Sequence, residues 1–126
     1  TLGLIMKIFK TKIFHQWTKK VDLKDVVLKQ AIDEMLNGQY EANLGGHLYK
    51  KRVAIGSKGK RGGVRTIIAF KKEHDVFFVY GFAKNAKANI NSKEKEFLKE
   101  LANDLFLLND QCVTTLIVKK ELIEVK

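Results

Sequence analysis

Apolar residues recur along the first third of the chain at spacings that change from one segment to the next. Residues 5–9 form a short apolar run with β-branched members, which predicts a strand. Residues 12–21 place apolar side chains three and four positions apart, which predicts an amphipathic helix. Asp22 is expected to cap a second helix, which Asn37 and Gly38 end. The buried face of that second helix is predicted to comprise Val26, Val27, Ala31, Met35 and Leu36.

The middle of the chain favours strands. Residues 44–46 (Leu-Gly-Gly) predict a turn, and three strand candidates follow at 48–55, 64–70 and 76–82. The first mixes apolar residues with cations and is expected to be half exposed. The next two are nearly continuous apolar runs, which is typical of central strands, and the polar residues 71–75 between them predict a hairpin connection.

The last third predicts one long helix and two shorter elements. Ser92 is expected to cap the long helix, whose apolar stripe is Phe97, Leu98, Leu101, Leu105 and Leu108. A further helix over 112–119 and a strand over 122–125 are expected to follow. The element order β-α-α-β-β-β-α, with this possible C-terminal helix and strand, predicts an α+β fold with a curved, mostly antiparallel sheet. Residues 6–126 are expected to form one domain, and residues 1–5 an upstream extension or cloning remnant.

Charge adds a functional indication to this pattern. The formal net charge is +10, and residues 47–91 hold eleven Lys and Arg against Glu73 and Asp75, so they supply +9 of it. A glycine-rich basic loop over 55–65 concentrates this charge further, which favours a polyanionic partner. The single cysteine, Cys112, excludes an internal disulfide and a zinc cluster of cysteines, and fits a reducing cytoplasm. The longest apolar runs hold five or six residues, far fewer than the ~20 that span a bilayer.

Two motifs resemble a known family. The run GKRGGVRTIIAF at 59–70 is followed one hairpin later by FVYGFAKN at 78–85. Together they resemble the RelE/HigB family, the toxins of type II toxin–antitoxin pairs, and the resemblance extends from residue 6 to about residue 108. It implies a small ribonuclease-like α+β fold and a cytoplasmic endoribonuclease that cuts mRNA on the ribosome. It also implies that no metal or cofactor is needed and that a cognate antitoxin, of helix-turn-helix or similar type, silences the enzyme.

Cleavage of RNA through its own 2′-OH requires a proton acceptor, charge stabilisation on the phosphorane and a proton donor for the leaving oxygen. The three histidines, His15, His47 and His74, fall in separate segments and offer no convincing pair. The resemblance implies that cations act instead. Arg65 would clamp the phosphate, Lys60 would lie in the loop beside it, and Lys84 would transfer protons, because a lysine crowded by cations is more easily deprotonated.

Other residues are expected to bind RNA without reacting. The aromatic position near the end of the strand is filled by Phe82, which can stack on a base but cannot donate a proton, with Tyr80 on the same face. The full set of expected RNA-binding residues is Lys50, Lys51, Arg52, Lys58, Arg61, Phe82, Asn85 and Lys87. For any single cation of this set a solvated surface role remains the alternative, for Phe82 a core role, and for Asn85 a cap of the turn.

Three functions stay open at this point. The leading one is a ribosome-dependent mRNA interferase. A gyrase-inhibiting toxin of the ParE type would share the fold, and a non-enzymatic RNA-binding module would use the same basic loop only to hold phosphates. Alanine at Arg65 separates an enzyme, which would lose cleavage, from a binder, which would lose affinity and its salt dependence.

Overall fold

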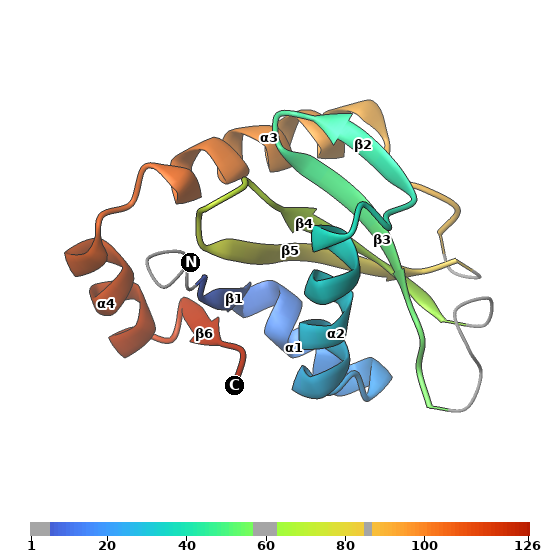
Figure 1. The fold of residues 1–126 in the computed structure, drawn as a ribbon, viewed down its shortest axis with the longest axis horizontal. Coiled ribbons are helices and arrows are strands. Elements are labelled where there is room, and N and C mark those ends of the chain that lie inside the picture. The colour runs from blue at the N-terminus through green and yellow to red at the C-terminus, as the bar shows by residue number, and fades with distance from the viewer. Residues whose placement is uncertain (1–5, 57–62, 85–86) are drawn as a thin grey trace.

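The computed structural model describes residues 6–56, 63–84 and 87–126 (Figure 1). The expected extension at residues 1–5 lies outside the described residues. In chain order the elements are β1 (Ile8–Thr11), α1 (Lys12–Val21), α2 (Asp25–Leu36), β2 (Ala42–Gly45), β3 (Leu48–Val53), β4 (Val64–Ala69), β5 (Val76–Ala83), α3 (Ser92–Phe106), α4 (Asp110–Val118) and β6 (Leu122–Glu124).

The described strands form one sheet in the order β2-β3-β4-β5-β1-β6. Only the β1–β5 pair is parallel within the described sheet, and the other neighbours are antiparallel. The α+β fold with a mostly antiparallel sheet, expected from the element order, is therefore confirmed, and so are the C-terminal helix and strand.

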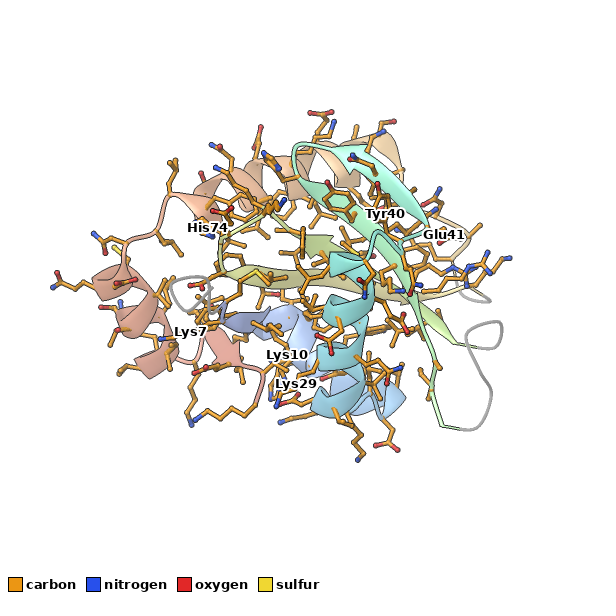
Figure 2. The ribbon with its side chains drawn as sticks, in the orientation of Figure 1. Lys7, Lys10, Lys29, Tyr40, Glu41 and His74 are labelled. Carbon is orange, nitrogen blue, oxygen red and sulfur yellow. The ribbon has the colours of Figure 1, made fainter. Side chains whose placement is uncertain are left out.

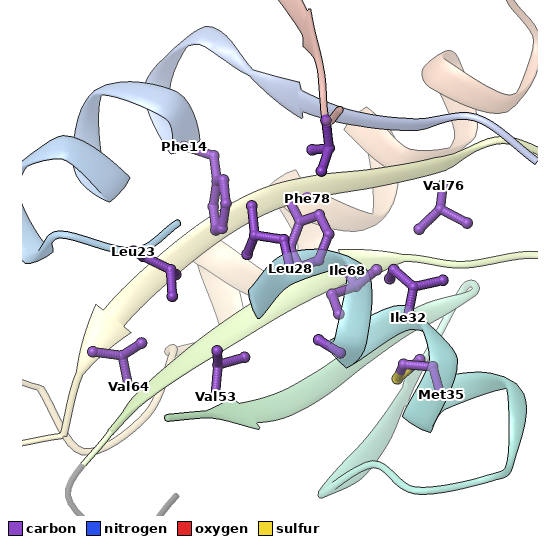
Figure 3. Packing of buried hydrophobic residues seen from close by; sticks show 12 residues of the cluster. Phe14, Leu23, Leu28, Ile32, Met35, Val53, Val64, Ile68, Val76 and Phe78 are labelled. Carbon is purple, nitrogen blue, oxygen red and sulfur yellow. The ribbon is translucent and has the colours of Figure 1, made fainter. Parts of the chain in front are cut away.

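Helices cover both faces of this sheet. Figure 1 shows α3 along the top of the view and α1 and α2 grouped below, with β3, β4 and β5 between them. On the face covered by α1 and α2, Phe14 and Leu28 pack against Ile68 and Phe78 (Figure 3). On the other face, Leu98, Ala102 and Leu105 of α3 pack against a second cluster that includes Leu48, Ile67 and Phe77. In the described structure α4 buries none of its own residues.

The start of α2 differs from the expectation. Asp22 does not cap α2: it ends α1 in the left-handed conformation (φ 57°), and its backbone N–H donates to the carbonyl of Thr18. Lys24 is the N-cap residue of α2 and makes no side-chain capping bond to the described residues. Aspartate can cap a helix, but it also tolerates the left-handed conformation. The tight connection between α1 and α2 requires that conformation at Asp22.

The buried faces of α2 and α3 also need correction. The buried residues of α2 are Leu28, Ala31, Ile32 and Met35, at the helical spacing of three and four, whereas Val26 is 70% exposed and Leu36 is 54% exposed. In α3 the predicted stripe holds at Leu98 and Leu105, but Phe97 is 64% exposed. In both helices the predicted stripe included apolar residues one position outside the face that meets the sheet.

Three boundaries shift as well. The N-cap of α3 is Asn91, not Ser92, and it forms a capping box with Glu94. The first strand lies at Ile8–Thr11, later than predicted, and runs directly into α1, whose N-cap is Thr11. The segment read as a turn at 44–46 contains the end of an unpredicted strand, β2, which pairs with β3.

Two glycines allow close approach within this fold. A Cβ on Gly81 of β5 would lie 2.1 Å from Cζ3 of Trp17, so the indole ring of α1 packs directly on the backbone of that strand. A Cβ on Gly63 would lie 1.9 Å from the carbonyl oxygen of Val53. Gly63 belongs to the glycine-rich loop, and the structure gives it a packing role at the point where β3 and β4 meet.

Candidate active site

Strand alternation sorts the cations of β3 onto two faces of the sheet. Lys51 is buried on the α2 side, where its Nζ lies 2.5 Å from Oε1 of Glu34. Arg52 pairs directly with Arg65 of β4, which in turn pairs with Phe82 of β5. Directly paired residues share a face, so these three form one row on the side covered by α3.

A second row lies beside the first on the same face. Lys50 of β3 pairs with Ile67 of β4, which pairs with Tyr80 of β5. The expectation that Tyr80 and Phe82 share a face is confirmed. Lys51 is the exception among the expected RNA-binding residues of β3, because successive side chains of a strand point to opposite faces. It lies away from the other cations and is tied to Glu34.

Arg65 is the most deeply buried cation of the two rows. Its side chain is 5% exposed, and its Nε lies 3.4 Å from Oε1 of Glu41. Its Nη1 is buried and has no hydrogen-bond partner among the described residues. A buried guanidinium N–H without a partner is costly, so the Arg65 side chain has hydrogen-bonding capacity that its described neighbours do not use.

Glu41, labelled in Figure 2, immediately precedes β2, and three cations lie within 4 Å of its carboxylate. Its Oε2 accepts a hydrogen bond from Nε of Arg52 at 3.0 Å, and its Oε1 lies 3.9 Å from Nζ of Lys50 in addition to its contact with Arg65. Burial raises the pKa of this carboxyl, but the Arg52 hydrogen bond and the charges of Lys50 and Arg65 outweigh it, so the pKa lies below its usual value. Glu41 is therefore a carboxylate at neutral pH.

A second carboxylate borders the rows on the β5 side. Glu94, in the first turn of α3, forms an ion pair with Lys87 and accepts a hydrogen bond from the Tyr80 hydroxyl at 3.3 Å. The Lys87 bond lowers the pKa of Glu94 and raises that of Lys87. Nζ of Lys87 also lies 5.7 Å from the centre of the Tyr80 ring. Lys87 is thus held against the sheet surface next to the second row.

The remaining expected site residues fall into three groups. Lys84 is exposed and follows Ala83, the residue of β5 that pairs with the first residue of β4. Phe82 is only 4% exposed and packs in the α3-side core, so its ring is covered and does not present a free face for stacking. Four residues lie outside the described residues: Lys58, Lys60, Arg61 and Asn85.

The histidines do not join this site. His47 and His74 both contact the ring of Phe106, at the opposite end of β3 and β4 from Arg52 and Arg65. His15 lies in α1, and burial together with the charge of Lys10 lowers its pKa. The expectation that the three histidines form no pair for proton transfer agrees with these positions.

The two carboxylates are the functional candidates that sequence reasoning missed. Glu94 could have been found, because Asn91 followed three residues later by Glu94 is a capping-box pattern that fixes this carboxylate at the start of a helix. Glu41 carries no such local signal. It reaches the cations only because its backbone N–H donates to the carbonyl of Lys50 at 2.8 Å, alongside the unpredicted β2–β3 pairing.

The described chain shows two further negative findings. No group of three or more His, Cys, Asp or Glu side chains within it is arranged to hold a metal ion. None of its helices has the length and apolar character needed to cross a bilayer. The arrangement of Arg52, Arg65 and Lys50 is suited to hold an anionic group, because charged hydrogen-bond donors of this kind stabilise negative charge on oxygen atoms.

Comparison with protein families identifies a match over most of the chain. A family model described as the RelE toxin of the RelE/RelB toxin–antitoxin system matches residues 6–125. A search of curated proteins gave no match. The matched segment includes every described element of the fold and both rows of the site.

Proposed function

The chain belongs to the RelE toxin family, and from this premise we propose that it is an mRNA interferase, an endoribonuclease that cuts mRNA on the ribosome through the RNA 2′-OH. The family assigns the chain to a toxin–antitoxin system and so implies a cognate antitoxin. Cleavage, the ribosome as its setting, a cytoplasmic location and an antitoxin of the helix-turn-helix type are parts of the proposal.

The observation that carries this proposal is the buried Nη1 of Arg65, which has no hydrogen-bond partner in the described part of the chain. A folded protein keeps such a group only where a ligand or a strong local constraint offsets its cost. The scissile phosphate of RNA is the ligand that the surrounding charge favours, since Arg52 and Lys50 lie on the same face. Arg65 would then donate to a phosphate oxygen whose negative charge increases in the transition state.

The remaining steps are assigned to residues at the ends of the strands. Lys84, exposed after β5, is our candidate for the proton transfers: it would take the proton of the 2′-OH as the new O–P bond forms and give a proton to the 5′-oxygen as the old P–O bond breaks. Lys60 is our candidate for a second contact to the phosphate from the glycine-rich loop. Lys87, held by Glu94 beside Tyr80, is proposed to contact the RNA backbone next to the scissile phosphate. This chemistry needs no metal ion or cofactor.

A single 2′-deoxy substitution tests the proposed reaction. Ribosomes carrying a short mRNA would be incubated with the protein, and the cut site mapped. The same mRNA would then be made with deoxyribose at the nucleotide 5′ to the cut, and, as the matched control, at the nucleotide preceding it. The first substitution should abolish cleavage and the second should not, and the unmodified mRNA should leave a 2′,3′-cyclic phosphate. Cleavage that survives the first substitution would exclude the mechanism. An intact mRNA would exclude ribonuclease activity and favour the alternative of a gyrase-inhibiting toxin.

A further inference from the structure

Glu41 places a negative charge inside a surface that otherwise suits an anion. Its two oxygens contact Arg52, Arg65 and Lys50 at 3.0, 3.4 and 3.9 Å. Its side chain is 24% exposed, so it lies at the surface end of the buried Arg65 side chain. The question is why a site for phosphate would contain a carboxylate that competes for the same cations.

The geometry of the guanidinium group gives one answer. The group is a rigid planar fork, and Glu41 takes its Nε whereas Nη1 stays without a described partner. The ion pair at Nε holds the guanidinium beside Glu41, and the hydrogen-bonding capacity of Nη1 stays unused by the described residues. Nη1 is buried, so a phosphate reaches it only when the groups that cover it move aside. Glu41 and the phosphate would then bind Arg65 at the same time, on different nitrogens.

The charge of Glu41 has the opposite effect on RNA affinity. It neutralises part of the charge of three cations, and it lies close to any phosphate bound at Nη1, so it weakens ground-state binding of RNA. Only interactions that are stronger in the transition state than in the ground state speed the chemical step. A residue that lowers affinity and still aims Arg65 therefore favours cleavage over simple binding.

We propose that Glu41 is a positioning residue of the cleavage site, which orients Arg65 toward the scissile phosphate and at the same time lowers the affinity of the site for RNA. This inference rests on the proposed function, because it concerns how the same site acts on RNA. It predicts effects of opposite sign on binding and on cleavage. Loss of a merely structural contact would weaken both.

The test compares Glu41→Gln, which keeps the side-chain shape and removes the charge, with the wild-type chain. RNA affinity would be measured with a fluorescent single-stranded oligonucleotide at several salt concentrations, and cleavage with programmed ribosomes under single-turnover conditions. Glu41→Gln should bind about 3- to 10-fold more tightly at low salt, with a salt slope steeper by about 0.7 for each cation that is freed. Its cleavage rate should fall about 10- to 100-fold, as expected when a catalytic group loses its alignment.

Two further variants control this comparison. Glu96→Gln makes the same charge change at a residue of α3 whose side chain is 69% exposed and whose only described ion pair is a 3.9 Å contact with Lys99, and it should leave binding and cleavage unchanged. Glu41→Asp keeps the charge but shortens the side chain. It should retain the wild-type affinity and salt slope and lose part of the cleavage rate.

Each contrary result has a distinct meaning. Weaker binding and slower cleavage in Glu41→Gln, or unchanged cleavage, would overturn the positioning role while wild-type cleavage still supports the proposed function. Tighter binding with faster cleavage would also overturn it and would make Glu41 an inhibitor of the site. A wild-type chain that neither binds nor cuts RNA would overturn the proposed function and this inference with it.

Discussion

Replacement of Gly81 by alanine is the sharpest test of how β5 is held. The new Cβ would lie 2.1, 2.4 and 2.5 Å from Cζ3, Cε3 and Cη2 of Trp17. Carbon atoms pack at about 3.5–4.0 Å, so the indole ring must move by more than about 1 Å. Trp17 packs against Phe14, with ring centroids 5.5 Å apart, so its movement disturbs the α1-side core.

The size of the effect follows from two opposing contributions. Overpacking of this kind costs about 1–3 kcal/mol, and the severity of the contact favours the upper half of that range. Alanine regains about 0.5–1 kcal/mol because it restricts the unfolded chain. We therefore expect a net loss of about 1–2 kcal/mol in the free energy of unfolding. For a chain of this length this corresponds to a fall of about 4–8 °C in melting temperature.

The assay is thermal and urea unfolding followed by circular dichroism, with Trp17→Leu and the double variant alongside. Trp17→Leu removes the ring atoms that clash, so the double variant should be at least about 1 kcal/mol more stable than the sum of the two single losses predicts. If Gly81→Ala is as stable as the wild type, or if the two losses simply add, the close packing of Trp17 on Gly81 is wrong.

Three other predictions follow from the structure. Lys51→Met should lower the free energy of unfolding because it removes the Lys51–Glu34 ion pair, and it should hardly change RNA affinity. Arg52→Met should weaken RNA binding in a salt titration and cause little loss of stability. The folded-state pKa of Glu41 lies below its ordinary value of 4.5, so the stability it contributes is present above that pH and is lost as pH falls through the lowered pKa. The difference in melting temperature between the wild type and Glu41→Gln should thus shrink from pH 7 to pH 3, and a constant difference would contradict this assignment. Phe97→Ser should change the free energy of unfolding by less than about 0.5 kcal/mol in urea, whereas a loss above about 2 kcal/mol would restore Phe97 to the core.

The elements with strong periodicity were predictable from the sequence. α1 was predicted with its observed bounds, and β4 and β5 were found because continuous apolar runs mark strands buried on both faces. β2 was not found, because Ala42–Gly45 has little strand propensity and forms a strand only through its pairing with β3. Asp22 was misassigned because a single residue type serves both helix capping and left-handed turns.

The candidate site was also only partly predictable from the sequence. Arg65 was predicted from its motif and stays a prediction as a site residue. The separation of Lys51 from Lys50 and Arg52 follows from the two-residue period of a strand, which the prediction of the RNA-binding residues did not take into account. The role of Glu41 depends on the β2–β3 pairing and on Arg65 from β4, so no local pattern could show it. Contacts between segments that are distant in sequence are the part of a site that local sequence patterns do not predict.

The most direct test of the account is primer extension on a reporter mRNA after induction of the wild-type chain and of Arg65→Lys, with Lys119→Gln as a control that removes an exposed cation of the C-terminal region. Arg65→Lys keeps the charge but loses the planar fork. We predict discrete cuts within translated codons for the wild type and for Lys119→Gln, and a loss of at least about 10-fold for Arg65→Lys. Growth arrest with an intact reporter mRNA, or cuts of equal strength in the Arg65 variant, would contradict the account.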